Sequence, residues 1–368
     1  MTHQPPLPSE RLRSLDFLRG FIMVLLALES TGLYEKLYDL SGEGGWGYFI
    51  QQFFHHPWHG LRFWDLIQPG FMFIAGTAMA FSLKKQQEQG FTWNQSFRKT
   101  LKRCGWLFFW GVLDYAVRPG GLSFELWDVL TQLSFTTLVT FLVFRWNVSL
   151  QFLFGAGLLL LTEILYRYTG IAGYDQPFTD QYNFGNYMDL ILMNKINSDG
   201  WVAINCLPTT VHTLAGAIAG KWLLQEKQKA LKYLLWAAAA CLLLGFTLDR
   251  MDITPIIKRI ATSSFTLATL GWCLLGLFAC YYIIDVKERN RHLDFFLIVG
   301  MNSIFIYLFF EIVGHRWFNE YIRSIVSGLL SIISVPKDLT GILASLSIFG
   351  LEWGLCYFLY KKKIFFKL

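Results

Sequence analysis

The chain is poor in charge: Asp, Glu, Lys and Arg make up only 16% of its 368 residues, whereas apolar residues make up 54% and aromatic residues 17%. Soluble globular proteins carry about 25% charged residues. This shortage of charge, together with a positive mean hydropathy, excludes an ordinary soluble enzyme. The formal net charge of +6 needs no nucleic acid to explain it.

Cysteine is also scarce, and the six cysteines have no CxxC spacing. Most of them fall inside apolar runs, away from the loops in which disulfide frameworks and zinc sites are built. We therefore expect neither a structural disulfide nor a zinc site. The cysteines are Cys104, Cys206, Cys241, Cys273, Cys280 and Cys356.

The chain lacks the usual nucleotide and nucleophile motifs. No GxGxxG fingerprint, Walker sequence or GxSxG elbow occurs in the strand context that its function requires. Gly70 with Gly76, and Gly216 with Gly220, instead have the small-residue spacing that lets membrane helices approach closely. A nucleotide-bearing substrate would have to bind in a membrane-embedded way.

Long apolar runs, by contrast, recur along the whole chain. Each of about 18 residues or more can cross a hydrocarbon core of roughly 30 Å. We predict an all-α polytopic membrane protein, a bundle of about ten transmembrane helices forming a single domain over 1–368. The predicted spans are 15–35, 64–83, 103–118, 126–144, 149–168, 207–224, 232–249, 262–285, 293–314 and 339–360.

The distribution of Lys and Arg predicts the orientation. Most of the 32 basic residues fall in segments that lie inside if both termini are cytoplasmic, as the positive-inside rule requires. Two longer segments, at about 36–62 and 169–206, then lie outside. The first ten residues form a short, polar and proline-rich segment, so we expect no cleavable signal peptide.

Three histidines and a carboxylate lie where the chain enters the second span: His55, His56, His59 and Asp65. Ionisable groups at membrane depth are costly and are therefore commonly functional. A histidine with a carboxylate partner is the usual general-base pair, although a wet interfacial hairpin would also tolerate these side chains. Pro57 makes a shared metal site awkward, so we expect no metal.

Other polar groups lie within or at the edges of the predicted spans, where they usually face the interior or a water-filled cavity, or form an interhelical hydrogen bond. Asp16 and Arg19, three residues apart, predict a structural ion pair. Glu29 and Asn302 sit deeper and are better functional candidates. The remaining groups are Asp114, Asp128, Gln132, Glu163, His212 and Glu311.

Several blocks resemble a known family. The segment 11–20 is similar to the opening of the transmembrane acyltransferases related to heparan-alpha-glucosaminide N-acetyltransferase, and His55-x-x-Trp58-x-Gly60-Leu61-x-x-x-Asp65-Leu66 is similar to their histidine motif. Further similar blocks follow in the same order, so the resemblance covers nearly the whole chain. Because the similar blocks begin near the start of this sequence, without the large luminal N-terminal domain of the lysosomal enzymes before them, we expect the bacterial NagX-like branch to be the nearer match. These blocks are 69–76, 129–133, 203–205 with Gly216 and Gly220, 255–265 and 300–311.

The resemblance implies an acetyltransferase that moves an acetyl group from cytoplasmic acetyl-CoA, as co-substrate, to an amino sugar or sugar hydroxyl at the outer side. It implies a multi-pass protein of the bacterial inner membrane, and a homodimer is compatible with it. His55 would act as base or transient acyl carrier, Asp65 as its orienting partner, and Asn302 as a candidate donor to the substrate carbonyl.

The resemblance also suggests substrate contacts. Glu29, Trp58 and Glu311 are candidates for the acceptor, and Glu29 and Phe310-Glu311 depart from the eukaryotic pattern. In the predicted topology Lys258 lies on the outer side of the membrane, so we do not expect it to bind the phosphates of CoA. The candidates for acetyl-CoA are Arg11, Arg13, Arg19, Lys102, Arg103 and Gln132.

Two other classes of function stay open. A secondary transporter for a sugar or amino sugar would explain ten spans and buried polar groups, but we find no convincing inverted repeat. A structural or assembly protein would explain the small-residue packing, but it would not need His55 and Asp65 together.

Overall fold

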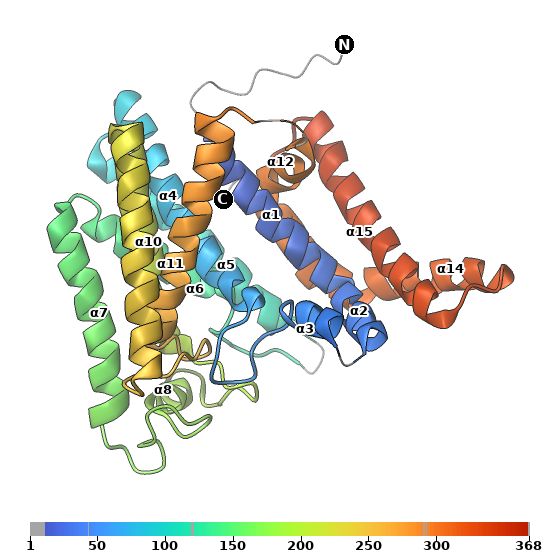
Figure 1. The fold of residues 1–368 in the computed structure, drawn as a ribbon, viewed down its shortest axis with the longest axis horizontal. Coiled ribbons are helices and arrows are strands. Elements are labelled where there is room, and N and C mark those ends of the chain that lie inside the picture. The colour runs from blue at the N-terminus through green and yellow to red at the C-terminus, as the bar shows by residue number, and fades with distance from the viewer. Residues whose placement is uncertain (1–11, 43, 119–120, 290, 292, 367–368) are drawn as a thin grey trace.

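The computed structural model describes residues 12–42, 44–118, 121–289, 291 and 293–366. Within these ranges every regular element is helical (Figure 1). The α-helices are α1 (Arg13–Ser30), α2 (Leu33–Ser41), α3 (Gly45–Gln51), α4 (Ile67–Glu88), α5 (Trp93–Ala116), α6 (Val129–Val143), α7 (Val148–Tyr168), α8 (Phe184–Met193), α9 (Cys206–Gln225), α10 (Lys227–Arg250), α11 (Ser263–Cys280), α12 (Asp294–Met301), α13 (Ser303–Phe309), α14 (Asn319–Ile332) and α15 (Lys337–Lys361). The 3-10 turns are η1 (Phe63–Leu66) and η2 (Ala203–Asn205), and the π-helical segments are η3 (Tyr281–Val286) and η4 (Phe310–Phe318).

The prediction of an all-α polytopic membrane protein is confirmed. All ten apolar segments of the sequence fall on these helices. By length and composition, five helices of the described chain can cross a membrane, and seven can if each of two bent helix pairs is one span. The number ten and the position of the termini stay predictions, because helices such as α5, which carries Arg98, Lys99, Lys102 and Arg103 in its first half, do not pass that test.

Local sequence explains where the helices begin and bend. Thr92 starts α5 with a capping box, in which its side chain accepts a hydrogen bond from the Gln95 backbone. Gly32, at φ +74°, lies at the 69° bend between α1 and α2, in a left-handed conformation that glycine adopts without strain. Asn302 lies at the break between α12 and α13, where the chain bends by 75° from α12 to the segment 303–332.

Helix α10 packs along α11, and α7 and α10 form an outer wall of the bundle (Figure 1). Their outward faces are apolar: Leu153 is 68% exposed, Trp236 74% and Leu243 70%. Such large exposed apolar faces are unsuited to water. They are the surfaces that lipid covers in a membrane protein.

Helices α4 and α9 pack closely at the centre because a glycine of each helix faces the backbone of the other. A Cβ added at Gly76 would lie 1.8 Å from the backbone oxygen of Thr213, and one at Gly216 would lie 2.0 Å from that of Phe73. The small-residue spacing in the sequence therefore marks a true backbone contact.

This contact gives the first prediction. Gly76→Ala will lower the midpoint of thermal unfolding in detergent, because the methyl group forces α4 and α9 apart, an overpacking cost of about 1–3 kcal/mol. Gly157→Ala is the matched control, since its Cβ would meet open space on α7, and there alanine favours the helix. Equal stability of the two variants would show that the close contact is not real.

Candidate active site

A large cavity runs through the interior of the bundle. Its volume is about 1110 Å³, and residues of α1, α4, α5, α6 and the α12–α13 segment line it. Along α4 the lining extends from Ile67 to Glu88, roughly 31 Å at about 1.5 Å per residue. The cavity is therefore elongated along the helices, and it suits a long ligand.

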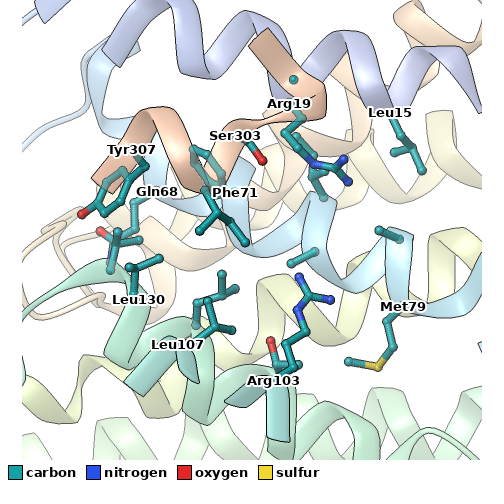
Figure 2. A pocket seen from close by; sticks show the side chains of 18 of the residues that line it. Leu15, Arg19, Gln68, Phe71, Met79, Arg103, Leu107, Leu130, Ser303 and Tyr307 are labelled. Atoms are coloured by element: carbon teal, nitrogen blue, oxygen red, sulfur yellow. The ribbon is translucent and has the colours of Figure 1, made fainter. Parts of the chain in front are cut away.

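One end of the cavity, which we call the basic end, is rich in cations. Figure 2 shows Arg19 of α1 and Arg103 of α5 on opposite walls. Arg19 donates from Nη1 to Asp16 Oδ1 at 3.2 Å, which confirms the predicted ion pair. The cations that line the basic end are Arg19, Lys84, Lys85, Lys99 and Arg103.

The other end, which we call the histidine end, carries His55 together with carboxylates and aromatic rings. Gln68 and Tyr307 lie together in Figure 2, away from the two arginines. The residues that define the histidine end are Glu29, His55, Trp201, Lys258 and Glu311. The cavity thus joins a cluster of cations to a titratable site.

Asp65 holds His55 in place. The Asp65 side chain is fully buried in η1, and its Oδ2 accepts the backbone N–H of Arg62 at 2.9 Å and of His56 at 3.3 Å. Its Oδ1 lies 3.1 Å from His55 Nδ1, while 41% of the His55 side chain remains accessible. Because the Nδ1 edge is engaged, Nε2 is the nitrogen that a ligand in the cavity would meet.

Pairing of two loops brings a third group to this site. The Gly60 N–H donates to the Ile256 carbonyl at 2.9 Å, and His59 forms an isolated antiparallel bridge with Ile257. The connection between α10 and α11 is thereby fixed beside the histidine segment. As a result Lys258 lies at the imidazole of His55.

Lys258 contacts both members of the pair. Its Nζ lies 2.9 Å from His55 Nδ1 and 3.5 Å from Asp65 Oδ1, and only 7% of its side chain is exposed. It also lies 5.5 Å from the centre of the Trp201 ring. An ammonium, a carboxylate and an imidazole nitrogen therefore meet at one point.

This environment shifts the pKa of both bases. Burial, followed by the charge of Lys258, lowers the pKa of His55 to about 4, although Asp65 acts in the opposite direction. Burial also lowers the pKa of Lys258 to about 8, against the favourable charge of Asp65. At neutral pH His55 is therefore uncharged and Lys258 mostly charged.

The other two histidines occupy different surroundings. His59 Nε2 lies 2.8 Å from Asp249 Oδ1 with 53% of its side chain exposed, and the ring of His56 packs against Gly60. In the described chain, no group of three or more His, Cys, Asp and Glu side chains is placed to hold a metal ion.

Of the predicted substrate residues, Glu29 and Glu311 line the cavity, and so do Arg19 and Arg103. Trp58 does not: its Nε1 donates to the Phe178 carbonyl at 2.8 Å, and its ring packs against buried residues that include Phe184 and Val202 of the segment 169–206. Its contacts suit a structural role in that segment.

Asn302 and Gln132 lie behind the cavity wall. Asn302 donates from Nδ2 to the Ile364 carbonyl at 3.2 Å and accepts from the Phe366 N–H at 3.0 Å. Gln132 accepts from Gln68 Nε2 and donates to the Trp127 carbonyl at 3.2 Å. The amide of each is engaged within the protein.

The remaining cationic candidates lie away from the cavity. Lys102 is exposed beside Arg103 and is not part of the lining. The Arg13 backbone donates to Asp285 Oδ1 at 3.1 Å, and its side chain does not line the cavity either. Arg11 lies outside the described residues.

Sequence reasoning missed Lys258 as a partner of His55. Two signals pointed to it. Lys258 lies in the family-like block that begins at Pro255, and the predicted topology puts it on the same side of the membrane as His55. It also missed Trp201 and Gln68 as lining residues. No signal in the sequence pointed to these two, because a single aromatic or amide residue forms no pattern.

Comparison of the sequence with known proteins identifies relatives of this chain. Residues 11–250 match the family model described as the catalytic region of heparan-alpha-glucosaminide N-acetyltransferase. Heparan-alpha-glucosaminide N-acetyltransferase of Homo sapiens is 25% identical over 97% of this chain and 60% of its own length, and that of Mus musculus is 23% identical over 98% and 61%. The chain thus spans about three fifths of these relatives. Because the match covers most of the chain, including His55 and Asp65, the chain belongs to the family of the heparan-alpha-glucosaminide N-acetyltransferase catalytic domain.

Proposed function

We propose that this protein is a membrane-embedded acetyltransferase that moves the acetyl group of acetyl-CoA to the amino group of a sugar. The observation that carries the proposal is one elongated cavity with cations at one end and the His55–Asp65 pair at the other. The human and mouse relatives are named for N-acetylation of a glucosaminide, which supports an amino sugar as acceptor.

The donor fits the cavity lengthwise. Acetyl-CoA carries its phosphates at one end of a long arm and its thioester at the other. Arg19 and Arg103 at the basic end offer the planar donor sets that bind phosphate oxygens. With this end facing the cytoplasm, as the positive-inside rule favours, the thioester would reach His55 near the outer side.

The reaction follows from the same arrangement. The sugar nitrogen attacks the thioester carbonyl carbon while His55 Nε2 takes a proton from that nitrogen; a C–N bond forms and the C–S bond breaks. His55 then gives the proton to the departing CoA sulfur. Asp65 stabilises the imidazolium through Nδ1. Asn302 has no part in this scheme, because its amide holds the segment 364–366.

The function is tested with purified protein in nanodiscs, radiolabelled acetyl-CoA and glucosamine. We expect one labelled N-acetyl product for each CoA thiol released. Label that stays on the protein when no acceptor is present would reveal an acetyl-histidine instead of direct transfer. Uptake of amino sugar into proteoliposomes without acetyl-CoA, with no labelled product, would contradict the enzyme and favour a transporter.

The carboxylates at the histidine end give a prediction about the acceptor. Glu311→Gln will raise the KM for glucosamine by roughly 3–10-fold, because a typical hydrogen bond contributes about 0.5–1.5 kcal/mol. The KM for acetyl-CoA should stay within about twofold. Glu320→Gln is the matched control, since this residue is exposed on α14 and paired with Arg323. An unchanged glucosamine KM in Glu311→Gln would remove Glu311 from the acceptor site.

A further inference from the structure

Two side chains compete for one nitrogen of His55. Asp65 Oδ1 lies 3.1 Å and Lys258 Nζ 2.9 Å from the same Nδ1 atom. A neutral imidazole nitrogen either donates one proton or accepts one, so it satisfies only one of these neighbours at a time. These contacts therefore allow two positions of the imidazole ring proton, one on Nε2 and one on Nδ1.

In the first arrangement Lys258 is charged and donates to Nδ1. An ammonium has donors and no acceptor, so Nδ1 must be unprotonated and the ring proton lies on Nε2. Asp65 Oδ1, 3.5 Å from Nζ, then pairs with the ammonium. In this form His55 presents an N–H to the cavity and cannot take a proton through Nε2.

In the second arrangement the ring proton lies on Nδ1 and is donated to Asp65 Oδ1. Nε2 then presents its lone pair to the cavity and is a competent base. A neutral Lys258 permits this form, because an uncharged amine can accept as well as donate. The charge on Lys258 thus decides between the two.

We propose that Lys258 is a positioning residue that selects the tautomer of His55: charged, it holds the ring proton on Nε2, and neutral, it releases the ring to Asp65 and makes Nε2 a base. The inference rests on the proposed function only where it assigns Nε2 of His55 the role of a catalytic base. The proton arrangement itself follows from two buried groups, Asp65 and Lys258, that meet at one nitrogen of His55, whatever the substrate.

The surroundings of Lys258 place this switch near physiological pH. Burial and the like charge of Arg259 disfavour the ammonium, whereas Asp65 and Glu29 favour it, and the balance lowers the pKa of Lys258 to about 8. The ring of Trp201 adds a weak attraction for the cation. Below about pH 8 the Nε2–H form should prevail, and above it the Nδ1–H form.

The test reads the ring proton directly. Full-length protein labelled with 15N-histidine, in nanodiscs, is titrated from about pH 6 to 10, with the His55 signals identified by their loss in His55→Gln. In the wild type we expect the proton to move from Nε2 to Nδ1 with a midpoint near 8. Lys258→Met should show the Nδ1–H form throughout, and Lys258→Arg, which stays charged, the Nε2–H form throughout.

A purely structural role for Lys258 gives a different result. It predicts one tautomer, unchanged between wild type and both variants, and that outcome overturns the proposal. Lys258→Met leaves Asp65 with His55 and the Arg62 and His56 backbone N–H groups as partners, and thermal unfolding verifies that it folds. If it does not fold, the comparison of wild type with Lys258→Arg still decides the matter.

Acetyl transfer gives a separate reading. The wild-type rate should rise with pH through about 8, Lys258→Met should lose that rise, and Lys258→Arg should fall by about 10²-fold, the lower range for loss of a general base. Tautomers that follow Lys258 without any acetyl transfer would reject the proposed function and keep the switch. Acetyl transfer with tautomers that ignore Lys258 would do the reverse.

Discussion

His55→Gln is expected to reduce the rate of acetyl transfer by about 10²–10⁴-fold, the range for removal of a general base. Glutamine keeps a polar side chain near Asp65 but cannot take a proton from the acceptor amine. Acetyl-CoA binding should remain within about threefold of wild type, because the cations of the basic end are untouched. Product formation from radiolabelled acetyl-CoA and calorimetric titration of CoA measure the two quantities.

The matched control is His59→Gln, four residues along the same segment. The side chain of His59 is 53% exposed and pairs with Asp249 at 2.8 Å, and exposed ion pairs contribute about 0–1 kcal/mol. We expect a change in rate below about fivefold. If His55→Gln kept more than about a tenth of the wild-type rate, or if His59→Gln were the more damaging change, His55 would not be the base.

The double change Arg19→Gln with Arg103→Gln is expected to weaken acetyl-CoA binding by roughly 10²–10⁴-fold. Each charge-assisted hydrogen bond to phosphate contributes about 1.5–3 kcal/mol, and 1.4 kcal/mol is tenfold in affinity. The rate at saturating acetyl-CoA should fall far less, since His55 and Asp65 are intact. Titration of CoA at two salt concentrations is the measurement, and the wild-type affinity alone should fall steeply with salt.

Lys102→Gln is the control for this pair. Lys102 adjoins Arg103 in sequence and carries the same charge, but it is exposed and does not line the cavity. We expect its CoA affinity to stay within about twofold of wild type. Equal losses in Lys102→Gln and in the double variant would show a diffuse charge effect, and the phosphates would then have no defined site at the basic end.

Several site residues could be predicted from the sequence because their signal is local. His55 and Asp65 are ten residues apart, and the backbone N–H groups that Asp65 accepts from, those of His56 and Arg62, lie between them. The resemblance to the family, and not the spacing, singled out His55 among the three histidines. Arg19 and Arg103 were predicted from charge in or near matching blocks. Asn302 and Gln132 show the limit, since a polar residue in a span faces either a cavity or a backbone carbonyl, and composition does not distinguish the two.

The sequence alone determined the class of protein, the helices and the histidine–carboxylate pair, because apolar runs, small-residue spacing and short motifs act over a few turns of chain. Only the tertiary structure placed Lys258, 203 residues from His55, at the same imidazole nitrogen. The physical reason is the pairing of two loops through Gly60 and Ile256, a contact between backbone atoms that leaves no mark on residue type. The tertiary structure likewise joined the basic end to the histidine end, because a cavity is the space that packed helices leave between them.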